Sequence, residues 1–197
     1  MIEAAFSDPV LAAQATFRAV LDATARPGTV ARLTQPLTAP SPLAAGVAAI
    51  ALTLCDQDTP VWLDPGLRGA PAVAEWLRFH TGARIVENPG TAAFALLSSS
   101  RDSPPFDRFN VGTLEYPDRS TTVVLQAESF RKGPSFTVTG PGIRVEQKVQ
   151  ITPLPSDMGE RLAANRRLFP RGIDLLFATE TEIMALPRAV HVLPGSR

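Results

Sequence analysis

The sequence predicts an α/β fold in which helices cover a mixed sheet. Two observations favour this class. In the first half, segments with helical periodicity alternate with short apolar segments typical of strands, whereas in the second half three segments alternate polar and apolar residues between Gly and Pro. The 197 residues, of which 45% are hydrophobic, are enough for one core. We therefore expect one domain over residues 1–197.

The first helix is expected to begin after Asp8, because Asp is a good N-cap and Pro9 suits the first helical position. Pro27 and Gly28 end it, since Pro forbids continuation and Gly tolerates the turn. An apolar stripe at helical spacing supports the assignment and comprises Val10, Ala13, Phe17, Val20 and Leu21.

The elements that follow are assigned from period and turn residues. Residues 29–34 alternate as a short strand, and Ser41-Pro42 indicates the start of a second helix over 42–54, apolar on all sides and therefore buried. A helix over 70–82 has Gly82 as its C-terminal cap. Further strands are expected over 59–64, 91–99, 120–130, 134–140, 144–153 and 173–178, a helix over about 156–168, and a short helical turn with an edge strand over 181–194.

Composition excludes several classes of partner. The 19 basic and 19 acidic residues balance, so bulk charge favours neither nucleic acid nor a membrane surface. The longest apolar uncharged segment, Leu43 to Cys55, has 13 residues and is too short to span a bilayer. Glu3 and Asp8 precede any basic residue, unlike a secretory signal. We expect a cytoplasmic protein.

Familiar cofactor and metal motifs fit poorly. Residues 139–145 (TGPGIRV) begin like a dinucleotide fingerprint, but Val145 replaces the third glycine and a strand follows, so we expect a hairpin-like turn. One Cys and two His lack metal-ligand spacing, and we expect no metal. Lys132 lies in a turn and Lys148 in an alternating strand, so neither resembles an activated amine for pyridoxal phosphate. We expect no cofactor.

Five residues are candidates for binding an anion or a partner. His80 and Thr81 end a helix, where His80 either complements the helix dipole or acts as a proton donor or phosphate contact. The other three candidates are arginines, of which Arg166 lies late in a helix, Arg171 in a Pro-Arg-Gly turn, and Arg188 after Pro187.

Two interpretations of the arginines are open on composition alone. Proline on either side of a turn fixes the backbone, which helps an arginine to grip a carboxylate or phosphate. Arginines in such turns also pair internally and bind helix carbonyls. We expect Arg171 to form an internal pair with Asp174, and Arg188 to meet a partner or an anion.

Seven segments together resemble one family. They are FRAVLDATARPG, ALTLCDQDTPVWL, WLRFHTGA, GTLEYPDRSTTVVL, TGPGI, FPRGIDLLF and ALPR, and they run from about residue 6 to 193. Their order and content resemble the H subunit of the bacterial carbon–phosphorus lyase core complex, the PhnH family. One departure is that Ala189 and Val190 follow ALPR, where the family commonly has threonines.

This resemblance implies a three-layer fold, similar to the large domain of pyridoxal-phosphate-dependent transferases but without that cofactor. It also implies a homodimer that assembles with the G, I and J subunits. The complex is a transferase in which an alkylphosphonate replaces the adenine of ATP, giving ribose 1-alkylphosphonate 5-triphosphate. The family's H subunit has no established catalytic residues, so His80, Arg171 and Arg188 are matched as motif residues only.

The expected function is therefore an accessory role in that complex, without catalysis by the subunit alone. The alternative is a free-standing enzyme that binds a phosphorylated small molecule near His80 and the C-terminal arginines. A third possibility, a cofactor-bearing transferase, would need an aldimine on Lys132 or Lys148.

Overall fold

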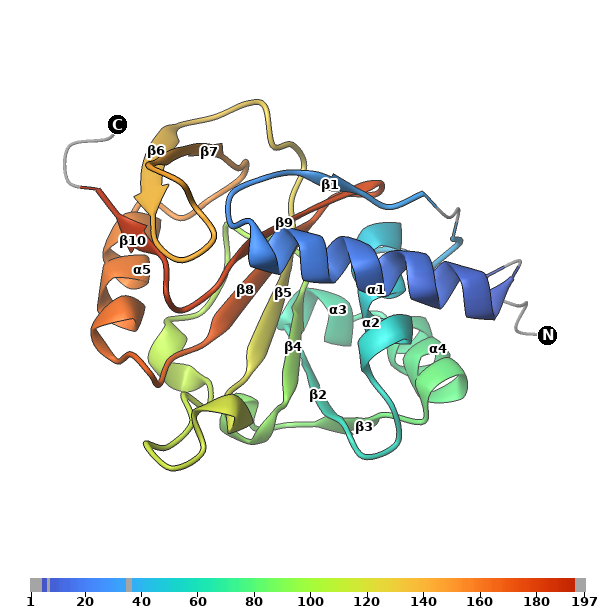
Figure 1. The fold of residues 1–197 in the computed structure, drawn as a ribbon. Helices are drawn as coiled ribbons and strands as arrows, with labels where there is room; N and C mark the ends of the chain where they lie inside the picture. The colour runs from blue at the N-terminus through green and yellow to red at the C-terminus, as the bar shows by residue number, and fades with distance from the viewer. Residues whose placement is uncertain (1–4, 7, 35–36, 194–197) are drawn as a thin grey trace.

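The computed structural model describes residues 5–6, 8–34 and 37–193 (Figure 1), so Glu3 and Pro194 lie outside it. The helices are α1 (Pro9–Ala25), α2 (Ala45–Leu54), α3 (Pro65–Arg68), α4 (Pro71–Thr81) and α5 (Met158–Arg167), with 3₁₀ turns at Pro89–Thr91, Phe106–Arg108 and Pro117–Arg119. The strands are β1 (Ala31–Arg32), β2 (Pro60–Leu63), β3 (Arg84–Val86), β4 (Phe94–Leu97), β5 (Thr122–Gln126), β6 (Ser135–Thr139), β7 (Gln147–Gln150), β8 (Asp174–Ala178), β9 (Glu182–Leu186) and β10 (His191–Val192).

The central sheet has the order β1-β9-β8-β5-β4-β2-β3. Strands β3, β2, β4, β5 and β8 are parallel, and β9 and β1 continue the sheet in antiparallel pairing. The mixed α/β class predicted from the sequence is confirmed. No helix within the described ranges is long and apolar enough to cross a membrane.

Alternate side chains of the central strands enter two different cores. Val124 of β5 packs with residues of α1, α2 and α4, whereas Val123 and Leu125 face the other side. That second core is closed by α5 and by a small antiparallel sheet of order β10-β6-β7. Figure 1 shows α5 and the small sheet at one end of the molecule. The second face is thus covered partly by strands, whereas the sequence predicts a sheet flanked by helices.

Helix α2 begins three residues later than expected. Its first amides are bonded by side chains from distant parts of the chain: Gln126 Oε1 accepts from the Ala44 N–H at 2.7 Å and Glu180 Oε2 from the Ala45 N–H at 2.7 Å. Because these caps come from β5 and from the β8–β9 turn, no local signal marks them. The prediction that α2 is buried is confirmed for residues 46–51.

The prediction of a short helical turn near the C-terminus is wrong. Residues 182–186 form β9, which inserts between β8 and β1. All of Ile183–Leu186 is buried, because helices cover one side of the strand and the second core covers the other. A short apolar run buried on both faces has no period-two signal, which explains the error. The expected edge strand is present as β10.

Helix α1 packs by its small residues rather than by its large ones. Asp8 caps it as expected, accepting a hydrogen bond from the Leu11 N–H at 3.1 Å. The buried face comprises Ala12, Thr16, Ala19, Val20 and Ala23. By contrast, the side chains of Val10, Phe17 and Leu21 are 67%, 46% and 51% exposed. Of the stripe that predicts the helix, Val20 is therefore buried and Ala13 half-buried, whereas the three larger residues face outward.

Candidate functional site

Arg188 and Asp174 form an ion pair where β8 begins and β9 has ended. The Arg188 Nε atom lies 3.1 Å from Asp174 Oδ1, its Nη2 donates to Asp174 Oδ2, and its backbone N–H donates to Oδ1 at 2.9 Å. The antiparallel pairing of β8 and β9, in which Leu175 lies opposite Leu186, brings the segment after β9 next to the first residue of β8. The Arg188 side chain is only 14% exposed and the Asp174 side chain 30%.

The same guanidinium holds two further segments. It donates to the Ser120 hydroxyl at 2.6 Å, and its Nη1 donates to the carbonyl of Pro117 and, at 3.5 Å, to that of Pro170. Arg188 therefore joins the loop before β5, the turn after α5 and the end of β9. We call this arrangement the arginine corner. It unites three segments that carry the family resemblance, GTLEYPDRSTTVVL, FPRGIDLLF and ALPR.

Asn165 fixes the Pro-Arg-Gly turn from the side of α5. Its amide is buried and bonds both backbone groups of Ile173, donating to the C=O and accepting from the N–H at 2.9 Å each. Gly172 has φ +124°, where a side chain is strained, and its N–H donates to the Val111 carbonyl at 2.9 Å. The turn is therefore bonded to the fold on both sides.

The prediction that Arg171 pairs with Asp174 is wrong. Asp174 is bonded by Arg188 instead, and the buried Nε of Arg171 has no hydrogen-bond partner among the described residues. Spacing of three residues favours the local pair, but β9 runs back along β8 and the residues after it bring Arg188 within hydrogen-bond distance of Asp174. The role expected for Arg171 thus belongs to Arg188.

Arg166 lies close to the arginine corner, on a shallow groove. Its Nε atom donates to His191 Nε2 at 2.9 Å, and its guanidinium stacks over the Phe169 ring at 4.5 Å. The groove has a volume of about 430 Å³ and is lined by Ala163, Arg166, Arg167, Phe169, His191 and Val192.

His80 and Thr81 lie far from the arginines. The His80 ring packs against Trp76 and Phe79, with ring centroids 4.6 and 5.0 Å apart, and burial lowers its pKa. Thr81 Oγ1 donates to the Leu77 carbonyl at 2.7 Å. Figure 1 shows α4, which carries both residues, at the opposite end of the molecule from α5. No single small ligand contacts both groups of candidates.

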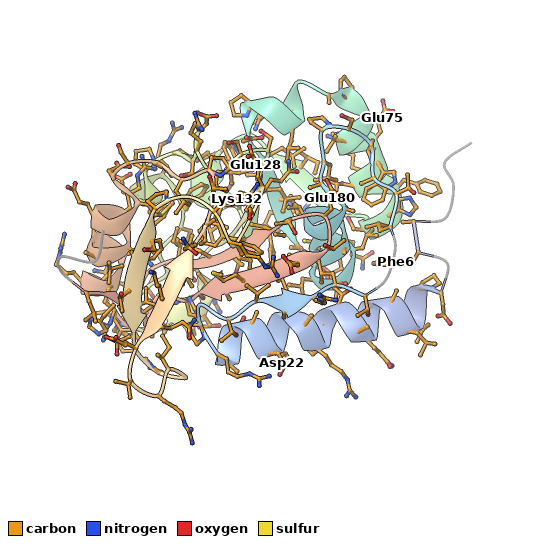
Figure 2. All side chains as sticks on the ribbon, turned by 90° about the horizontal axis from the view of Figure 1, so that it is seen from above. Phe6, Asp22, Glu75, Glu128, Lys132 and Glu180 are labelled. Atoms are coloured by element: carbon orange, nitrogen blue, oxygen red, sulfur yellow. The ribbon has the colours of Figure 1, made fainter. Side chains whose placement is uncertain are left out.

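A second depression lies at the carboxyl ends of β4, β5 and β8, where open α/β sheets usually bind ligands. Its volume is about 630 Å³, and its lining includes Glu128 and Glu180, which Figure 2 labels. Glu182 also lines it and is bonded to Arg131 at 2.6 Å, which lowers the pKa of the Glu182 carboxyl.

This pocket is poorly suited to phosphate. The N-terminus of α2 faces it, but the Glu180 carboxylate already accepts from the Ala45 N–H there. Helix N-termini bind anions through such free N–H groups. The internal carboxylate takes that place, and the other glutamates add negative charge.

Neither lysine belongs to these sites. Both Lys132 and Lys148 are exposed, Lys132 in the turn before β6 and Lys148 on β7.

Comparison with known proteins places this fold in a family. Residues 4–193 match the family model described as "Bacterial phosphonate metabolism protein (PhnH)". The chain belongs to the PhnH family. It is 44% identical over 188 residues to alpha-D-ribose 1-methylphosphonate 5-triphosphate synthase subunit PhnH of Rhizobium meliloti (strain 1021), covering 95% of this chain and 94% of that protein. It is also 34% identical over 82 residues, 42% of each chain, to the putative C-P lyase subunit protein HtxG of Stutzerimonas stutzeri.

The PhnH family match spans the segments of the arginine corner as well as α1 to α4. Sequence reasoning alone missed Asn165 and Ser120 as partners in this corner, and it assigned Asp174 to Arg171 instead of Arg188. The signal that was available is the polar Asn165 near the end of a helix, where amide side chains commonly bond to backbone groups.

Proposed function

We propose that this PhnH-family chain is an accessory subunit of the complex that makes ribose 1-alkylphosphonate 5-triphosphate in phosphonate metabolism. In the proposed reaction, a phosphonate oxygen bonds to C1 of the ATP ribose while the bond to adenine breaks and adenine leaves. The observation that carries the proposal is the 44% identity over 95% of the chain to a named subunit of that synthase. We place the complex in the cytoplasm.

The geometry supports a role in assembly for this subunit. Arg188, expected to meet a partner or an anion, forms six internal hydrogen bonds with its neighbours instead. The pocket at the carboxyl edge of the sheet carries three glutamates against one arginine, Arg131, which is bonded to Glu182, and the net negative charge repels a triphosphate. His80 and the arginines lie apart, so the alternative of a free-standing enzyme using both groups gains no support.

The proposal extends to the domain organisation and to the kind of fold. We propose one domain over residues 1–197, similar to the large domain of pyridoxal-phosphate-dependent transferases but without the cofactor. The supporting observation is that both cores share the strands of one sheet. A single cooperative unfolding transition by fluorescence and circular dichroism tests the single domain, and two separated transitions would contradict it.

The proposed partners are the G, I and J subunits. Co-expression of the tagged chain with these three subunits, followed by native mass determination, is expected to give one complex containing all four. Assembly of G, I and J without this chain, under the same conditions, would overturn the proposal. Turnover of a phosphonate or nucleotide by the purified chain alone would favour the free-standing enzyme.

We further propose that two copies pair through the exposed stripe of α1. An antiparallel second copy centred on Phe17 would place Leu21 opposite Ala13, so that the exposed apolar side chains of the two copies cover one another. Light scattering should show a dimer for the wild type and a monomer for Phe17→Glu. A dimeric Phe17→Glu variant would exclude this interface.

A further inference from the structure

Three large apolar side chains are exposed beside the arginine corner. Leu114 and Tyr116, in the loop before β5, are 68% and 51% exposed, and Phe169, after α5, is 51% exposed. The corner itself brings these segments together, because Arg188 Nη1 donates to the carbonyls of both Pro117 and Pro170. Figure 1 shows the loop and the end of α5 on the same side of the molecule.

An arginine guanidinium lies over each of the two aromatic rings, Tyr116 and Phe169. The Arg119 guanidinium lies 4.0 Å from the Tyr116 ring centroid, and the Arg166 guanidinium lies 4.5 Å from that of Phe169. Arg166 is fixed in turn by His191. Stacked pairs of this kind lose little side-chain freedom when a partner covers them.

The loop that carries Tyr116 is also ordered from within. Asn110 accepts a hydrogen bond from the Gly112 N–H at 2.9 Å and donates to the Arg119 carbonyl at 2.8 Å. Thr113 Oγ1 accepts from the Tyr116 N–H at 3.0 Å. The exposed residues are thus presented on a rigid platform.

The charge of this surface identifies the chemistry of its partner. Segments 113–119 and 166–171 carry four arginines against two carboxylates, Glu115 and Asp118. Protein interfaces are enriched in aromatic residues and Arg, whose forked guanidinium matches carboxylates. A groove of about 430 Å³ beside Phe169 provides a depression for a side chain.

We propose that this surface docks a carboxylate-bearing segment of another protein subunit. We call it the aromatic–arginine surface, and it comprises Leu114, Tyr116, Arg119, Arg166, Arg167 and Phe169. The inference rests on the proposed function, because it assigns a place on this chain to assembly with a different subunit. It is separate from the α1 stripe, which we assign to a second copy.

Two variants and one matched control test the assignment. Tyr116→Ala with Phe169→Ala removes the aromatic anchors, and Arg119→Glu with Arg167→Glu reverses the charge. The control is Arg78→Glu with Phe79→Ala on α4, where Phe79 is 64% exposed and Arg78 is also exposed. Each tagged variant is titrated with the purified G, I and J subunits, and its thermal unfolding is recorded.

Both test variants should unfold like the wild type but bind at least about 100-fold more weakly, because each removes two anchors of the kind that dominates protein interfaces. The control should bind like the wild type. Wild-type affinity should also fall as salt is raised, because charge attraction is screened.

Three results would overturn the assignment. Test variants that bind like the wild type would exclude this surface while leaving the proposed function intact. A control that binds as weakly as the test variants would show that the effect is not specific to it. Calorimetric binding of inorganic phosphate to the chain alone, lost in Arg119→Glu with Arg167→Glu, would assign the surface to a small anion. Failure of the wild type itself to bind the subunits would instead reject the proposed function.

Discussion

Replacing Arg188 by methionine tests the structural role of the arginine corner. The change keeps the aliphatic stem but leaves the Asp174 carboxylate, 30% exposed, without its cation. It also removes donors to Ser120 and Pro117. Breaking a buried ion pair costs about 3–5 kcal/mol, and partial exposure places the expected loss of unfolding free energy near the lower end, about 3 kcal/mol. For a chain of this size, the melting temperature should fall by roughly 6–12 °C.

Urea denaturation, with thermal unfolding as a second measurement, checks this loss. The control is Arg26→Met, which removes an ion pair whose two side chains are each 62% exposed; its loss should be below about 1 kcal/mol. In a double-mutant cycle with Asp174→Asn, the combined variant should lose less than the sum of the single losses. If Arg188→Met loses no more than Arg26→Met, or if the cycle is additive, the reasoning is refuted.

Four further predictions concern other parts of the fold. Asn165→Ala leaves both backbone groups of Ile173 unbonded in a buried site and should lower the unfolding free energy by about 2–4 kcal/mol in urea denaturation; a loss below 1 kcal/mol would contradict it. Gly46→Ala places a Cβ 2.0 Å from the Thr179 carbonyl oxygen and should cost about 2 kcal/mol or more, whereas Gly159→Ala, with open space around it, should stabilise α5 by about 0.5–1 kcal/mol. Burial lowers the pKa of His80 in the folded chain, so on acidification the unfolded chain takes up this proton first. The free energy of unfolding should therefore be highest above the ordinary histidine pKa and should fall as the pH drops through the pKa of the folded chain. Melting temperatures measured from pH 7.5 to 5 should show this fall, and a less steep one in His80→Gln. Burial, with a smaller effect of Asp56, raises the pKa of the Cys55 thiol to about 12, so a thiol reagent at pH 8 should react at least about 100-fold more slowly with the native than with the urea-unfolded chain; equal rates would disprove this.

Local signals in the sequence predicted much of the fold. Helix α1 begins as expected because Asp8 caps it, and α4 ends as expected because Gly82 adopts φ +71° at its C-terminus. The turn after Thr139 joins two antiparallel strands, as its glycines and proline indicate. In each case, the decisive contacts lie within a few residues of one another.

Contacts between distant residues could not be predicted in the same way. The start of α2 depends on Gln126 and Glu180, and the partner of Asp174 depends on the register of β8 and β9. The outward direction of Phe17 depends on how closely small residues let α1 approach the sheet. None of these is visible in a local window, which explains why the sequence predicts a pair between Arg171 and Asp174 rather than the observed pair with Arg188.

The strand order constrains when the protein can be completed during synthesis. Among the strands that the structure describes, β1, near the start of the chain, pairs only with β9, near its end. The arginine corner likewise needs Arg188 to hold loops made much earlier. Until β9 and Arg188 leave the ribosome, β1 has no strand to pair with and the loop before β5 lacks the hydrogen bonds that Arg188 supplies. Partners that recognise the finished surfaces would therefore select released, fully folded chains over nascent ones.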